Sequence, residues 1–126
     1  MSRFLTLAAA ALFTTMAAMP LHAEDAVSTS IADLYKNKAS LKGKQVELKG
    51  KVVKVNNNIM NRNFLHLQDG SGDMAKGNHD LTITSDATAT MGQQVTIVGT
   101  VAVDNDFGYG YVYPLIVEKA VITPAK

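Results

Sequence analysis

The sequence predicts an all-β protein, a five-stranded OB-type Greek-key barrel with a short N-terminal helix. The main observation is a repeated frame, in which Val46-Glu47-Leu48-Lys49-Gly50-Lys51-Val52 returns as Val95-Thr96-Ile97-Val98-Gly99-Thr100-Val101. Each copy alternates with period two, as half-buried strands do. Each also carries a glycine in mid-strand, where strands bend, bulge or admit another backbone. Two long, bent strands in a short chain indicate a small closed barrel.

The first residues have the pattern of a cleavable export signal. Arg3 precedes the apolar run 4–19, Pro20 interrupts it, and Ala23 ends an acceptable cleavage site. We therefore expect residues 1–23 to be a signal peptide, residues 24–126 to form one domain in the periplasm, and the mature chain to have no membrane span.

The mature chain is expected to begin with a flexible lead and a helix. Ser30 can cap a helix over residues 31–37 that places Ile31, Leu34 and Tyr35 on one face. Five strands are then expected over residues 45–55, 63–68, 81–85, 93–103 and 111–122. Between them lie turn signals that include Asn56-Asn57-Asn58, Asp69-Gly70 and Met91-Gly92.

The composition limits the class of ligand and the means of stabilisation. The chain has no cysteine, so neither disulfides nor thiolate metal ligands are available. Without Arg3, basic and acidic residues are equal in number, whereas general polyanion binders carry a basic excess. The basic residues are nevertheless clustered, with Lys36, Lys38, Lys42, Lys44, Lys49, Lys51 and Lys54 close together. This cluster is either a solvated face that also protects a strand edge or a stripe for phosphate groups.

The second predicted strand carries the candidate binding face. Leu65 and Leu67 should point into the barrel, so Phe64, His66 and Gln68 should point outward. In an OB barrel this face, with the flanking loops, is the usual binding surface. The expected ligand-binding residues are Arg62, Asn63, Phe64, His66, Gln68, Phe107, Tyr109 and Tyr111. An alternative is that Phe64 packs under a loop and that His66 bonds a neighbouring carbonyl.

The block Ile59-Met60-Asn61-Arg62-Asn63-Phe64-Leu65-His66-Leu67-Gln68-Asp69-Gly70-Ser71-Gly72 resembles the signature of a known family. That family comprises small exported bacterial OB-fold proteins described as nucleic-acid-binding-like. The resemblance continues through residues 81–84 and 107–111. Phe64 stands where the family has tryptophan, and Asn58 where it has glycine. The resemblance implies an exported OB barrel and names no activity.

Metal binding is the most specific chemical hypothesis. Soft or borderline donors lie around the second predicted strand, namely Met60, His66, Met74 and His79. Thioether and imidazole groups without thiolate favour copper(I), with Met60 and His66 as its expected ligands. Asp69, Ser71 and Asp73 imitate the start of a calcium loop, but Met74 stands where that loop requires glycine. An ordinary turn explains those three residues.

No catalytic motif is recognisable in the sequence. Neither a nucleophile elbow nor a phosphate-binding glycine loop occurs. The sequence therefore predicts a periplasmic, non-enzymatic protein that binds a small ligand or a partner protein. One alternative is a copper(I) carrier. The other is a single-stranded nucleic-acid-binding module that would use the lysines and the exposed aromatic residues.

Overall fold

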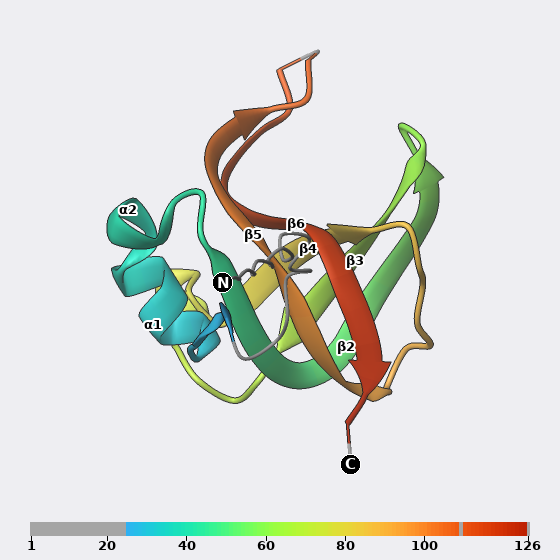
Figure 1. The fold of residues 1–126 in the computed structure, drawn as a ribbon, viewed down its shortest axis with the longest axis horizontal. Coiled ribbons are helices and arrows are strands. Elements are labelled where there is room, and N and C mark those ends of the chain that lie inside the picture. The colour runs from blue at the N-terminus through green and yellow to red at the C-terminus, as the bar shows by residue number, and fades with distance from the viewer. Residues whose placement is uncertain (1–24, 109, 126) are drawn as a thin grey trace, which may run out of the picture.

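The computed structural model describes residues 25–108 and 110–125, and within them it confirms an all-β fold (Figure 1). The elements in chain order are β1 (Val27–Ser28), α1 (Ile31–Lys36), α2 (Lys38–Leu41), β2 (Gln45–Ile59), β3 (Arg62–Gln68), the 3-10 helix η2 (Met74–Lys76), β4 (Asp80–Ser85), β5 (Gln94–Asp106) and β6 (Val112–Pro124). The predicted signal peptide lies outside the described residues. None of the helices within them has the length and apolar character needed to cross a bilayer.

The strands form one sheet that closes on itself. The order is β1-β2-β3-β4-β6-β5, and β5 also pairs with β2. Neighbouring strands in the ring are antiparallel, except that β4 and β6 run parallel where Ile83 meets Val117. The predicted closed barrel is thus present.

The strand count is six rather than the predicted five, because the expected flexible lead contributes β1. Val27 and Ser28 lie parallel to β2, opposite Val46 and Glu47. The Thr29 amide also donates to the Glu47 carbonyl at 3.1 Å. Backbone pairing therefore orders a segment whose side chains show no strand pattern.

The predicted helix is present, and a second short helix follows it. The Ser30 hydroxyl caps α1 by accepting from the Asp33 amide at 3.1 Å. Ile31 and Leu34 are fully buried, as their shared face predicts. α2 was not expected, since its sequence Lys-Ala-Ser-Leu has no apolar period; only Leu41 packs against the core.

Two strands, β2 and β5, extend well beyond their predicted ends, and β6 runs two residues further than predicted. β2 continues through the three asparagines to Ile59, with an extra residue between the Asn56–Phe64 and Ile59–Arg62 pairs. Asn58 has a φ of 62°, a left-handed conformation that asparagine tolerates better than most residues. β5 likewise runs on to Asp106, with a φ of 53° at Asp104. Residues typical of turns are therefore accommodated here as irregularities within strands.

The two copies of the repeated frame pair with each other. In the antiparallel β2–β5 ladder Val46 lies opposite Gly99 and Gly50 lies opposite Val95. A Cβ atom on Gly50 would lie 2.7 Å from the Gln68 carbonyl oxygen. On Gly99 it would lie 2.6 Å from Cγ1 of Val117. Each glycine therefore permits a close approach of β3 or β6 that closes the ring.

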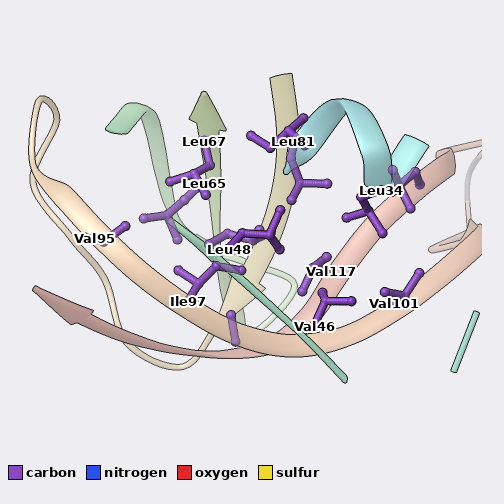
Figure 2. Close-up of a cluster of buried hydrophobic side chains, with 14 of the residues drawn as sticks. Leu34, Val46, Leu48, Leu65, Leu67, Leu81, Val95, Ile97, Val101 and Val117 are labelled. Carbon is purple, nitrogen blue, oxygen red and sulfur yellow. The ribbon is translucent and has the colours of Figure 1, made fainter. Parts of the chain in front are cut away.

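The core fills the barrel interior, where side chains from α1 and from β2 to β6 converge (Figure 2). Leu65 and Leu67 have no exposed surface, as predicted. Because side chains alternate along a strand, Phe64, His66 and Gln68 lie on the opposite face of β3. This outer face carries the candidate site.

Candidate functional site

The outer face of β3 is bordered by β2 and β4. His66 lies opposite Lys54 on β2 and opposite Thr82 on β4. Phe64 lies opposite Asn56 and Thr84 in the same two ladders. The tips of the β2–β3 and β5–β6 hairpins project toward the same side of the barrel (Figure 1). Residues from both hairpins therefore meet the outer end of β3.

An aromatic cluster joins the β5–β6 hairpin to β3. The ring centroid of Phe64 lies 5.6 Å from that of Phe107 and 6.1 Å from that of Tyr113. Phe107 and Tyr113 are also 5.6 Å apart in an edge-to-face arrangement. Phe64 is consequently only 5% exposed, although it lies outside the main core cluster. The alternative in which Phe64 packs under a loop therefore describes its position.

Arg62 contacts the β5–β6 hairpin through a cation–π interaction with Phe107 and an ion pair with Glu118. Its guanidinium lies 5.1 Å from the centroid of the Phe107 ring and 3.2 Å from the Glu118 carboxylate. Glu118 also accepts from the side-chain amide of Asn105 at 2.6 Å and from the Thr84 hydroxyl at 3.3 Å. Arg62 thus has partners on both sides, and its main role in the structure is to hold the hairpin in place.

His66 is oriented by a carboxylate rather than by the carbonyl considered from the sequence. Its Nδ1 lies 2.6 Å from Oδ1 of Asp80, and the Gln68 side-chain amide donates to Oδ2 of Asp80 at 2.9 Å. A carboxylate partner favours the proton on Nδ1, which leaves the lone pair on Nε2 for a ligand. Gln68, expected as a ligand contact, is engaged in holding this carboxylate.

Tyr35 also contacts Asp80, through the Asp80 backbone. Its hydroxyl donates to the Asp80 backbone carbonyl at 2.6 Å. Burial, together with the negative charge of Asp80, raises the pKa of the Tyr35 phenol above its ordinary value. Tyr35 therefore stays neutral at physiological pH and ties α1 to the start of β4.

A pocket of about 370 Å³ opens beside His66. Its lining comes from the two hairpins and β3, namely Asn56, Ile59, Met60, Phe64, His66, Tyr111 and Tyr113. We call it the hairpin pocket. Aromatic and aliphatic walls with a few polar groups are typical of sites for small ligands.

A larger hollow of about 630 Å³ lies between β4 and β6 and includes the Arg62–Glu118 pair. The Ser85 hydroxyl already donates to the Ala120 carbonyl at 2.6 Å in this region. Arg62, Thr84 and Ser85 of this hollow already have hydrogen-bond partners, the first two on Glu118 and the third on Ala120.

The remaining predicted ligand residues have different positions. The Asn63 side chain accepts from the Asn58 amide at 3.0 Å and donates to the Ala87 carbonyl at 3.0 Å, so it ties loops together. Tyr111 is 62% exposed and lines the hairpin pocket. Tyr109 lies outside the described residues.

The four soft donors separate into two groups. Met60 and His66 line the hairpin pocket together. Met74 is 77% exposed on η2, and neither Met74 nor His79 contributes to that lining. Among the described residues, no three His, Cys, Asp or Glu side chains are grouped as metal ligands. Any metal in this pocket would therefore rely on methionine.

The Asp69–Asp73 segment has structural roles. Asp69 accepts from the Ile31 amide at 2.9 Å and Ser71 from the Ala32 amide at 3.0 Å, which satisfies the first amides of α1. Asp73 accepts from the Ala75 amide at the start of η2. These bonds are those of an ordinary turn between strands.

Part of the lysine cluster borders the outer face. Lys49, Lys51 and Lys54 are exposed along β2, and Lys51 and Lys54 lie opposite Gln68 and His66. None of the three forms an ion pair within residues 25–108 and 110–125. Lys54 therefore places positive charge next to His66. Lys49 and Lys51 line a separate hollow that includes Gln68 and Asp69.

The sequence did not indicate Asp80. Tyr113 is expected only among the aromatic residues of the nucleic-acid alternative and not among the ligand-binding residues. Asp80 meets His66 because Gln68 and Asp80 are opposite each other in the β3–β4 ladder. The sequence alone does not give this register, because it depends on how β3 and β4 pair in the folded protein. Period-two alternation in the last strand could have grouped Tyr113 with Tyr111.

No protein-family model and no curated protein matches this chain. Thirty-two chains of solved structures are similar to it. One is the crystal structure of a putative aspartyl-tRNA synthetase from Leishmania major Friedlin, with a TM-score of 0.51 and 13% identity. The match covers 89% of this chain but only 23% of that chain. At this identity the likeness shows a shared fold alone.

Proposed function

We propose that this protein is an exported, non-enzymatic binding protein built on an OB-type barrel, with its ligand site in the hairpin pocket. Strands β2, β3 and β4 follow one another, and β5 returns to lie beside β2, which is the strand order of a Greek key. The resemblance of residues 59–72 to exported OB-fold proteins supports the same class and the periplasmic location.

The observation that carries the proposal is the composition of the pocket wall. Two separate hairpins bring Met60, Tyr111 and Tyr113 around His66, whose imidazole is held by Asp80. Tyr111 remains 62% exposed, so its ring is available for contact. A small molecule, or one side chain of a partner protein, fits a pocket of about 370 Å³.

Native mass spectrometry of protein purified from the periplasm tests this proposal. We expect the wild-type protein to carry an additional mass that Tyr111→Ala and His66→Ala lose. Met91→Ala is the matched control, because Met91 is 64% exposed and lies outside the pocket lining. Retention of the same mass by all three variants would place the ligand elsewhere.

Single-stranded nucleic acid is the second candidate ligand, favoured by the register of β2 against β3. Lys51 and Lys54 lie beside Gln68 and His66, and Tyr111 offers a ring on which a base could stack. The fold is also shared with a chain that is named as a tRNA synthetase. Export from the cytoplasm makes this candidate second to a small ligand or protein.

Fluorescence anisotropy with a labelled oligothymidylate distinguishes the two candidates. For nucleic acid, we expect affinity to fall with salt, and each of Lys51→Gln and Lys54→Gln to reduce the salt slope by about 0.7. Lys38→Gln, on α2, is the control. No salt-dependent binding by the wild-type protein would exclude this function.

A further inference from the structure

We propose that the hairpin pocket binds a soft monovalent metal ion, copper(I), through the thioether of Met60 and Nε2 of His66. This inference rests on the proposed ligand site and names the chemistry of its ligand.

Met60 occupies a backbone conformation that does not suit it. Ile59 pairs with Arg62, so Met60 and Asn61 are the two central residues of a tight hairpin turn. Their φ values are 52° and 65°, and positive φ at both positions is characteristic of a type I′ turn. Asparagine and glycine are the usual residues there. Asn61 meets this preference, whereas methionine in the left-handed region costs about 1 kcal/mol or more.

Burial does not offset that cost. The Met60 side chain is 41% exposed and belongs neither to the core cluster nor to the apolar residues packed against it. Met60 instead lines the hairpin pocket. A strained, partly exposed residue at a pocket wall indicates a role in binding rather than in folding.

His66 supplies the second donor in a fixed orientation. The Asp80 carboxylate lies 2.6 Å from Nδ1, and the Gln68 amide holds the other carboxylate oxygen at 2.9 Å. Carboxylate–histidine pairs of this kind orient metal-ligating imidazoles and strengthen Nε2 as a donor. The Asp80–Gln68 contact therefore acts as support behind the imidazole.

The donor set determines the class of metal. Thioether sulfur is neutral and soft, which favours copper(I) over magnesium, calcium or manganese, and imidazole also suits copper. The rings of Tyr111 and Tyr113 line the same pocket, where their faces can attract a cation and exclude water. Silver(I) has the same charge and softness, and serves as a probe that is not oxidised in air.

Competition with a chromophoric copper(I) chelator under reducing, oxygen-free conditions tests the assignment. We expect the wild-type protein to withdraw one copper(I) per chain, and Met60→Leu and His66→Gln each to weaken binding at least tenfold. Met74→Leu is the matched control and should bind as the wild type does, because Met74 is exposed outside the pocket. X-ray absorption should detect sulfur and nitrogen ligands, and sulfur should be absent in Met60→Leu.

Met60→Asn separates the metal role from a folding role. Asparagine suits a type I′ turn but lacks a thioether, so this variant should melt at a higher temperature and still lose copper(I). Circular dichroism of His66→Gln checks that its barrel is intact. Equal copper(I) affinity of the wild type and the Met60→Leu/His66→Gln double variant would overturn the inference, as would full binding by Met60→Asn.

The failure of this inference differs from failure of the proposed function. If silver(I) and copper(I) do not bind but Tyr111→Ala still loses a co-purified organic ligand, the pocket is a binding site without a metal. If no pocket variant changes either the binding of these metal ions or the retention of a co-purified organic ligand, the ligand site lies elsewhere on the protein.

Discussion

Gly50 lies directly opposite Val95 across the β2–β5 ladder. The same ladder sets Val46 opposite Gly99, so each copy of the repeated frame presents its glycine to the first valine of the other copy. Both strands can bend at these glycines because β3 and β6 approach where a Cβ atom would otherwise lie. The two copies of the repeated frame thus form the β2–β5 ladder, which is the pairing that closes the barrel.

Gly50→Ala should destabilise the protein by about 1–3 kcal/mol, since the new methyl group would meet a backbone oxygen that cannot move without disturbing the β2–β3 ladder. Urea unfolding followed by circular dichroism measures this. Lys49→Ala, at the exposed neighbouring position, should change stability by less than about 0.5 kcal/mol. An unaltered midpoint for Gly50→Ala would show that the strands can separate there at little cost.

Phe64→Ala should cost about 3 kcal/mol despite the outward direction of its side chain, because the ring is 5% exposed and packs against Phe107 and Tyr113. Leu67→Ala, in the main core, should cost about 2–5 kcal/mol. Tyr111→Ala should remain near the wild type, since Tyr111 is largely exposed. Thermal melts of the three variants check the order, and a stable Phe64→Ala protein would mean that the hairpin does not depend on the aromatic cluster.

Asp69→Ala should destabilise the protein by about 1–2 kcal/mol, because it removes the acceptor for the Ile31 amide at the start of α1. Hydrogen exchange of the α1 amides should rise together with this loss. Asp73→Ala serves as the comparison, since Asp73 caps only the exposed turn η2. Equal effects of the two substitutions would argue against a special role for Asp69 in docking α1.

The Tyr35 phenol should make stability fall at alkaline pH. Its pKa in the folded protein is raised by burial and then by Asp80, so its contribution is complete below the unfolded pKa of about 10 and is lost as pH rises through the folded pKa. Urea unfolding between pH 8 and pH 11 measures this loss. Tyr35→Phe should show a smaller decrease over that range. Parallel curves for the two proteins would assign the alkaline loss to other groups.

The sequence by itself determined the five long strands, though not β1 or every strand end, and which side chains of β3 face the core. Alternation is a local property, so Leu65 and Leu67 could be placed inside the barrel without any knowledge of their partners. The mid-strand glycines, and Ser30 as the cap of α1, could likewise be recognised from their neighbours alone. These features depend on residues close together in the chain.

Only the tertiary structure decided what covers the outer face of β3. Phe64 and His66 both point outward, yet one is buried beneath Phe107 and Tyr113 while the other meets Asp80 and the hairpin pocket. That difference depends on where the β5–β6 hairpin folds and on the β3–β4 register. Both are set by contacts between segments far apart in the chain, whose combined free energy no local pattern records.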